Sequence, residues 1–570
     1  MRLQNDVSKP LLSMQYKASL LHSRSLVSQD TRKKIESMRK EIQELRSQRD
    51  AASSSTRSES VVGSSHANQG DKVAEALHDL KIDLENLSLD DVLVETPLAE
   101  EALRVFADLF LPQFPIIGSI SATRMYNLHP LLLWTILMIV FSHHRDKLDD
   151  TLYERLNEAY VKQLRTEILD APLPLHKIQS LLLLCIWPMP VIAQACDPSW
   201  LYCGMAIHAS RYMGLDRGHN VPSLRSLGVV AGNADLRTNT WLGCFYTATS
   251  LSMQLGLHPP IEADLDLTAI QSFLARNTLP YKFEMLVRIQ IVVAKYTNLF
   301  AHNISQDTSI SFIRMIESEL DVLQKEVYEK GFSSKKIEFN ILDVKLHYYA
   351  LLIPKLPPES SSRQIILTTG LAAALRMISI SALQQPSSSA MDLMSLQRRR
   401  SLPKNYYRSL AFATIFLLKF FYLNSSTPPE DKQAAAKHIK LVQNVFSTCS
   451  ISDTDEYARA AKVFESLARL SPGNLDSTMK LRLTHRMGVS ILLDALSTAA
   501  EVRGRPVELG ENETLDQVVA TSESHPTIEE PSDGTSLTDD QVDSTMDFLV
   551  EFWDDPLLNM VNFDDLPSYD

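Results

Sequence analysis

Three of the five cysteines in this 570-residue chain, Cys185, Cys196 and Cys203, lie close to His208 and raise the question of a metal site. Structural zinc sites usually supply two cysteines separated by about two to four residues, and the sequence contains no such pair. His208 follows Cys203 by five positions, which is about 140° around a helix, so the two side chains point from different faces. We therefore predict that these thiols are small buried apolar groups and that the chain holds no metal there.

Motifs for catalysis are absent from the sequence as well. The chain has no phosphate-binding glycine loop, no His-Glu-x-x-His motif and no Gly-x-Ser-x-Gly nucleophile turn. His143 and His144 follow the apolar run 131–141, and we expect this histidine pair on the surface. The sequence thus favours a protein that is not an enzyme.

The cysteines are positioned by a predicted pair of helices. Pro188 terminates the apolar helix that contains Cys185. Asp197 can cap the next helix, Pro198 suits its first turn, and Gly214 can end it. The residues that share one face of this second helix are Trp200, Cys203 and Ile207.

Composition and charge predict a large helical protein with two unlike ends. Hydrophobic residues make up 45% of the chain, only 17 residues are glycine, and long segments have helical periodicity. Residues 1–50 contain 11 Lys and Arg against 6 Asp and Glu, whereas residues 506–570 contain 18 Asp and Glu and no Lys or Arg. This asymmetry is typical of proteins that contact nucleic acid at one end and other proteins at the other.

Membrane and secretion signals are not found in the sequence. No signal-peptide pattern begins the chain, and its longest apolar run, 131–141, is shorter than the roughly 20 residues that span a bilayer. We expect a soluble, intracellular protein with no membrane partner.

The N-terminal 50 residues form a basic segment that ends in a short predicted helix, 31–50. Apolar residues recur there at coiled-coil spacing for about two heptads, fewer than the three to four that indicate a coiled coil firmly. An ordinary charged helix and a dimerisation helix both remain open. The residues of the dimer seam would be Ile35, Met38, Ile42 and Leu45. A Ser-rich flexible linker, 51–71, follows.

Helical periodicity then continues over residues 72–500, with Pro- and Ser-rich interruptions at 354–364 and 384–405. Residues 453–470 are predicted to form an amphipathic helix with acidic residues in its first turn. The basic stretch Gln-Arg-Arg-Arg at 397–400 is either a weak targeting patch or, as we expect, a solvated loop.

The acidic tail, 501–570, is predicted to be mostly disordered because it is too polar to build a core. Its segment 545–566 places large apolar side chains among Asp and Glu, which favours an activation segment that folds into a partner's groove. A C-terminal helix docked on the chain's own core is the alternative. The anchors of the activation segment would be Phe548, Leu549, Phe552, Trp553, Leu557, Leu558 and Phe563.

Together these segments resemble the regulatory domain, or middle homology region, of fungal zinc-cluster (Zn₂Cys₆) transcription factors, best over residues 95–270. The resemblance rests on LPQFPII at 111–117, IQSLLLLCIWP at 178–188, DPSWLYCGMAIHASRYMGLDR at 197–217 and LRTNTWLGCFYTATSLSMQLGLHPPI at 236–261. The residues that match the structural signature are Trp200, Gly204, Gly214, Leu215, Arg237, Trp241, Gly256 and Pro259. Leu242, Ala248 and Leu257 depart from the family pattern.

The family's DNA-binding module needs six clustered cysteines that bind zinc, and no cysteine precedes Cys185 here. Either the gene model lacks an upstream exon, or the protein is a natural regulator without its own cluster; no zinc is expected in this chain as it stands.

The resemblance implies an all-α protein with a short coiled-coil-like helix at its N-terminus. It further implies a nuclear transcriptional regulator of RNA polymerase II genes, most simply an activator. The expected partners are a second copy, DNA (directly or through a partner), coactivators and a small-molecule effector. The alternative is a cluster-less partner or dominant-negative module that does not contact DNA.

Overall fold

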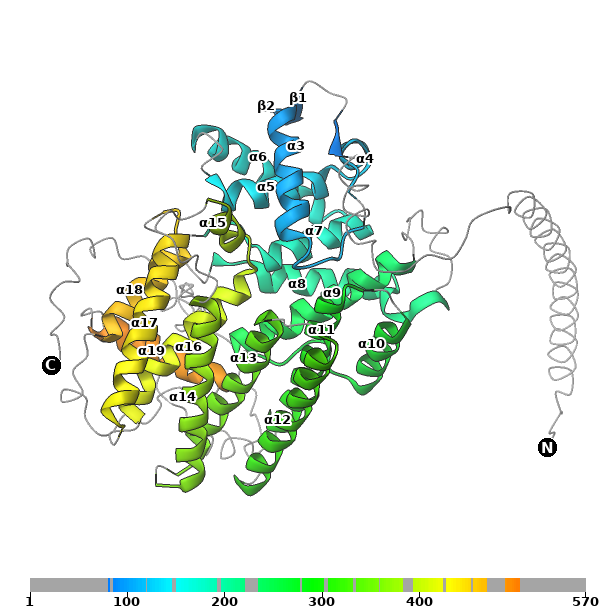
Figure 1. The fold of residues 1–570 in the computed structure, drawn as a ribbon. Helices are drawn as coiled ribbons and strands as arrows, with labels where there is room; N and C mark the ends of the chain where they lie inside the picture. Colours follow the sequence, from blue (N-terminus) through cyan, green and yellow to red (C-terminus); the bar gives the residue numbers. More distant parts are fainter. Residues whose placement is uncertain are drawn as a thin grey trace, which may run out of the picture. The chain divides into compact units, whose positions relative to one another are not determined.

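The computed structural model describes residues 80–82, 86–118, 120–145, 150–191, 196–220, 234–276, 279–301, 306–331, 335–357, 359–382, 393–423, 427–452, 455–468 and 487–502. These residues belong to one compact unit that begins at Val73. The predicted helix 31–50, the linker 51–71 and the activation segment 545–566 lie outside the described residues. Helices dominate the described part, which confirms the all-α prediction (Figure 1).

A small antiparallel hairpin begins the described part of the chain. Strands β1 (Asn86–Leu89) and β2 (Val92–Glu95) pair so that Leu87 lies opposite Val94. Alternate residues of both strands are buried, which is the period of a half-buried strand. The hairpin leads into α3 (Thr96–Val105) and a π-helical turn, η3 (Phe106–Phe110), whose two phenylalanines are fully buried.

The first group of helices surrounds the apolar run that the sequence analysis noted. That run forms α5 (Pro130–His143), which buries every residue from Leu131 to Ser142 because it is apolar on all sides. It packs against α4 (Ala122–Leu128), α6 (Asp150–Ile168) and α7 (Leu175–Ile186). The helices that follow are α8 (Ser199–Tyr212), the 3₁₀ turn η6 (Leu215–Asn220), α9 (Ala234–Leu255) and α10 (Asp264–Arg276).

A second group of longer helices lies beside the first, and α12, α13 and α14 run side by side (Figure 1). Its members are α11 (Tyr281–Ala301), α12 (Gln306–Glu329), α13 (Lys335–Leu352), η8 (Ile353–Lys355), α14 (Ser361–Ala382), α15 (Leu393–Arg400), α16 (Lys404–Leu423), α17 (Pro429–Cys449), α18 (Glu456–Ala468), η9 (Met487–Val489) and α19 (Ser490–Val502). By length and composition α14 could cross a membrane, but it packs against α13, α16 and α17 within the core.

Two predicted features differ from the structure in this second group. The prediction of a solvated loop at 397–400 is wrong, because Arg398, Arg399 and Arg400 form the last turn of α15, where cations are favoured by the helix dipole. The amphipathic helix predicted over 453–470 is confirmed as α18. It begins later, at Glu456, because Asp455 caps it: a carboxylate oxygen of Asp455 accepts a hydrogen bond from Ala458 N at 2.9 Å.

Candidate functional site

The cysteine-rich helix pair is held together by contacts at both ends of α8. At its start, Asp197 Oδ1 accepts a hydrogen bond from the backbone N–H of Ser199 at 3.0 Å. At its end, Gly214 adopts a positive φ of 65°, which glycine tolerates without steric cost. The Gly214 carbonyl oxygen then accepts a hydrogen bond from Arg237 Nη2 at 3.2 Å. Arg237 lies near the start of α9, so this bond ties the end of α8 to the next helix.

The prediction of buried thiols is confirmed for Cys185 and Cys203 and is wrong for Cys196. Cys185, Cys203 and Cys244 are buried, whereas Cys196 is exposed. His208 is exposed on the opposite side of α8 from Cys203, as the helical spacing predicts. Burial raises the pKa of the Cys244 thiol to about 12, so this thiol is neutral at physiological pH. No group of three or more His, Cys, Asp or Glu among the described residues could hold a metal ion.

The centre of α9 is buried on all sides. Trp241 is fully enclosed, and the Arg211 guanidinium lies 5.4 Å from the centre of its ring. Arg211 also forms an ion pair of 2.7 Å with Asp266 at the start of α10. Gly256 ends α9 with a φ of 67°, and Leu257 N donates to Ser252 O at 2.9 Å, which is the bond of a Schellman cap.

Two glycines have different surroundings from those the sequence suggests. A Cβ at Gly204, one of the predicted signature residues, would meet no atom within 4 Å. A Cβ at Gly243, which the sequence analysis did not select, would lie 2.6 Å from Ile116 Cγ2. Gly243 therefore allows α9 to approach the segment 111–117, while Leu215 and Pro259 are simply buried.

A cluster of four charged side chains joins the start of α8 to α16 and α18. Asp197 Oδ2 lies 2.6 Å from Arg408 Nη2 and 3.5 Å from Lys404 Nζ. Glu456 completes the cluster, with Oε1 at 3.1 Å from Arg408 Nε and Oε2 at 2.5 Å from Lys404 Nζ. The charges alternate in sign and sum to zero. The Asp197 side chain is only 4% exposed, so it depends on both cations for compensation.

In this cluster, the attraction of the two cations outweighs the effect of burial on the carboxylate pKa values. Burial alone would raise the pKa of Asp197, but Lys404 and Arg408 hold it well below its usual range. Burial likewise opposes ionisation of Glu456, and the same two cations lower its pKa to about 2. Both carboxylates are therefore charged at physiological pH.

Of the histidine pair, His144 is buried and His143 is half-buried, so the prediction of a surface location is wrong for His144. His144 is buried, with Nε2 3.0 Å from Ser401 Oγ. The same serine accepts a hydrogen bond at its backbone oxygen from Trp187 Nε1 at 3.1 Å. Desolvation lowers the pKa of His143 to about 4, and the Nδ1–H of this ring donates to Ile139 O at 2.8 Å. The sequence did not indicate the buried position of His144, because its partner Ser401 lies 257 positions away in the chain.

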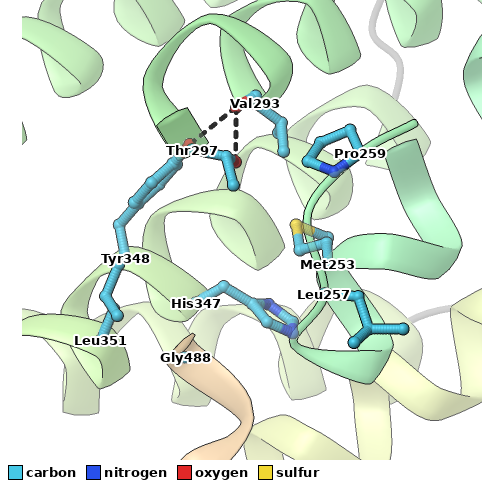
Figure 2. Close-up of a pocket in the computed structure, with 9 residues that line it drawn as sticks. All are labelled: Met253, Leu257, Pro259, Val293, Thr297, His347, Tyr348, Leu351 and Gly488. Atoms are coloured by element: carbon cyan, nitrogen blue, oxygen red, sulfur yellow. Dashed lines mark hydrogen bonds between the residues drawn. The ribbon is translucent and has the colours of Figure 1, made fainter. Parts of the chain in front are cut away.

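A small cavity lies behind the turn that closes α9 (Figure 2). Its volume is about 30 Å³, room for roughly two water molecules at ~10–15 Å³ each. Apolar side chains form most of its wall, and the ring of His347 from α13 points into it. The residues that line it are Met253, Leu257, Pro259, Val293, Thr297, His347, Tyr348, Leu351 and Gly488.

Comparison with protein families finds one match within this helical body. Residues 103–285 match the model of the fungal-specific transcription factor domain. The chain is similar to that family over this part, which is less than half of its length. The fungal-specific transcription factor domain thus extends from α3 to the start of α11 and contains the α8–α9 pair.

Similar proteins are found among regulators of yeasts. The putative transcription factor SEF1 of Eremothecium gossypii is 25% identical over 454 residues, which are 76% of this chain and 41% of that protein. The transcriptional regulatory protein SEF1 of Candida albicans is 25% identical over 443 residues, 74% of this chain and 46% of that protein. The regulatory protein LEU3 of Saccharomyces cerevisiae is 24% identical over 295 residues, 47% of this chain and 32% of that protein. The chain spans less than half the length of these relatives, and no solved structure matches it.

The zinc cluster that the resemblance implies does not fit the described cysteines. Zinc binds thiolates that are grouped within a few residues of each other. Burial raises the pKa of Cys185, Cys203 and Cys244, so they are neutral thiols inside an apolar core. No step of the function proposed below therefore involves zinc bound to these residues.

Proposed function

We propose that this chain is a nuclear, non-enzymatic regulator of transcription whose helical body controls the acidic tail. The observation that carries the proposal is the match of residues 103–285 to the fungal-specific transcription factor domain. The names of the relatives, all transcription factors or regulatory proteins, support it. In this proposal the segment 545–566 recruits coactivators, and the helix 31–50 pairs two copies of the chain.

The charged cluster supports control of the tail by the body. It ties the fungal-specific transcription factor domain, at Asp197, to α16 and α18. A second buried ion pair, Lys419 with Asp494 at 2.6 Å, ties α16 to α19, the last described helix before the tail. A change in the domain can therefore reach the start of the tail through packed, charge-linked helices.

Activation is tested by fusing residues 506–570 to an unrelated DNA-binding domain and measuring a reporter gene. We expect transcription to rise, and we expect the rise to be lost when Phe548, Phe552 and Trp553 are changed to Ala. The matched control changes Asp516, Glu523 and Asp533 to Asn or Gln, outside the activation segment. A silent fusion would contradict the activator role.

The alternative is a partner module that regulates without contacting DNA. Its test is a gel shift with the full chain at physiological salt, because the basic head supplies only salt-sensitive phosphate attraction. Binding without sequence preference would favour the partner module.

Pairing through 31–50 is tested by sedimentation of Ile42→Asp, which should reduce the dimer fraction.

A further inference from the structure

The structure points to a ligand site in the cavity behind the closing turn of α9. We propose that this cavity binds a small, mainly apolar molecule that carries one hydroxyl group, and that the hydroxyl donates a hydrogen bond to His347 Nε2. As a regulatory site it rests on the proposed function, since it would supply the effector of the helical body. As a binding site it depends only on the geometry described here.

The protonation pattern of His347 follows from its neighbours. Its Nδ1 lies 3.0 Å from the backbone oxygen of Asp343 and 3.3 Å from Asp343 Oδ1. The backbone oxygen can only accept a hydrogen bond, and the other carboxylate oxygen of Asp343 accepts one from Ser409 Oγ at 2.7 Å. Nδ1 therefore carries a proton, and a ring with this single proton offers its acceptor at Nε2.

The acceptor at Nε2 is available to a ligand. His347 is 7% exposed and its ring stacks on Phe412 at 4.1 Å, which fixes its orientation toward the cavity (Figure 2). Among the described residues, no side chain or backbone group forms a hydrogen bond with Nε2. An acceptor that faces a cavity without a protein partner is stabilised when a donor fills that cavity.

The other polar groups of the wall direct their hydroxyls elsewhere. Thr297 Oγ1 donates to Val293 O at 2.7 Å, and Tyr348 Oη donates to the same oxygen at 3.1 Å (Figure 2). The rest of the wall is apolar, with Met253, Leu257 and Leu351 among its side chains. A molecule with one donor and an apolar body matches this wall, whereas a polyanion would leave its charges unpaired.

One side of the cavity is rigid and the other can adapt. At the rigid side, η9 lies directly on α13: a Cβ at Gly488 would be 2.4 Å from His347 O. At the other side, Met253 and Leu257 are half-buried. Methionine has three rotatable bonds and fills irregular spaces, so a molecule larger than two waters would enter by displacing the Met253 side chain.

The walls also explain why such a ligand would matter for regulation. They come from the closing turn of α9, which belongs to the fungal-specific transcription factor domain, and from α11, α13 and η9. The turn η9 leads directly into α19, the last described helix before the tail. A ligand in the cavity would contact both the family domain and the segment that leads to the tail.

Binding is tested on the full purified chain with cyclopentanol as the probe and cyclopentyl methyl ether as its partner without a donor. Methyl-methionine NMR, with the Met253 signal as reporter, gives both dissociation constants. We expect the alcohol to bind at least tenfold more tightly than the ether, a difference of ~1.4 kcal/mol. Equal binding of the two probes would overturn the proposal.

Two variants distinguish binding in this cavity from binding elsewhere on the protein. His347→Asn keeps an N–H donor near Asp343 but removes Nε2, so the preference for the alcohol should disappear. Leu257→Phe leaves His347 intact and fills the mouth, so both probes should bind more weakly. Val322→Ala, on an exposed face of α12, is the control and should bind like the original chain. Alcohol preference retained in His347→Asn, with an unchanged unfolding midpoint, would contradict the role of Nε2.

The regulatory role has its own readout. Cyclopentanol should change reporter transcription by the full chain and leave transcription by His347→Asn unchanged. If the probe binds but transcription responds in neither, the effector role is wrong and the binding site stands. The fusion of residues 506–570 contains none of the cavity residues, so its failure would count against the proposed function alone.

Discussion

At the scale of single residues, two glycines of the fungal-specific transcription factor domain differ in what a methyl group would meet. A Cβ at Gly243 would lie 2.6 Å from Ile116 Cγ2, so Gly243→Ala should destabilise the protein by about 1–3 kcal/mol through overpacking. Gly204 lies inside α8 with open space beside it, so Gly204→Ala should stabilise by roughly 0.5–1 kcal/mol through reduced backbone entropy. Urea unfolding of both variants checks the opposite signs.

Equal effects in the two variants would mean that α9 can move away from the segment 111–117. The pair also shows a limit of sequence reading. The sequence shows that a helical position lacks a side chain, but the packing neighbour that requires this is seen only in the structure. Ile116 is far from Gly243 in the chain, and no local pattern identifies it. Gly214 was predicted correctly because its reason, a positive φ at a helix end, is local, and Gly256 ends its helix for the same reason.

His143 should make the stability of the body depend on pH. Burial is the main cause that lowers its pKa from 6.5 to about 4, and the positive charges of Lys404 and Arg400 act in the same direction. At a pH between 4 and 6.5, His143 is therefore protonated in the unfolded chain and unprotonated in the folded chain. Stability from this residue is complete above pH 6.5 and falls as the pH drops toward 4, by up to about 3 kcal/mol.

The measurement is urea unfolding at pH 7 and pH 4.5 of the original chain and of His143→Asn. Asn keeps a donor near Ile139 O and cannot titrate, so the loss of stability toward pH 4.5 should be smaller. It should not vanish, because desolvation also lowers the pKa of His176 to about 4. An unchanged loss in His143→Asn would show that this ring is protonated in the folded protein.

At the scale of elements, the charged cluster should be the most sensitive link between helices. Arg408→Met leaves Asp197 and Glu456 buried with one cation between them, which should cost ~3–5 kcal/mol. Lys325→Met breaks an exposed pair with Glu329 within α12 and should cost no more than about 0.5 kcal/mol. Urea midpoints of the two variants give the comparison. Similar costs would mean that water reaches the cluster.

The same cluster predicts a second loss of stability in stronger acid. The pKa of Glu456 is lowered to about 2, and that of Asp197 lies well below its usual range. Their contribution is present above the ordinary carboxyl pKa of ~4 and is lost as the pH falls toward 2. In Arg408→Met the free energy of unfolding should fall less between pH 4 and pH 2 than it does in the original chain.

Helix ends could be predicted from the sequence, and contacts between helices could not. Pro188 and Gly214 were predicted to end helices through local backbone geometry, and the structure confirms both. Asp197 was predicted to cap α8, but Pro198 is the N-cap residue, and Asp197 accepts from Ser199 N one position earlier. The ion pair of Asp197 with Arg408 joins residues 211 positions apart. The helix α15 was missed because its Arg-rich sequence lacks an apolar periodic face.

At the scale of the whole molecule, the family domain shares its core with the helices that follow it. Trp187 Nε1 donates to Ser401 O, and Arg459 Nη1 donates to Val191 O at 2.9 Å. Lys336 Nζ donates to Gln113 Oε1 at 2.6 Å. Each bond joins a residue within 103–285 to one beyond it. The cavity at His347 likewise takes its walls from both sides of that limit.

We therefore predict that residues 103–285 do not fold alone, although they match a family model by themselves. Cut at residue 285, the segment would expose the face of α9 that now packs on α11 and α16, and it would leave Asp197 without either cation. Residues 73–502 keep every described contact and should unfold in one transition. Near-UV circular dichroism and urea unfolding of the two segments test this prediction. A cooperative transition in residues 103–285 would show that the domain is independent, and any signal from the cavity would then have to cross an interface between two separately stable units.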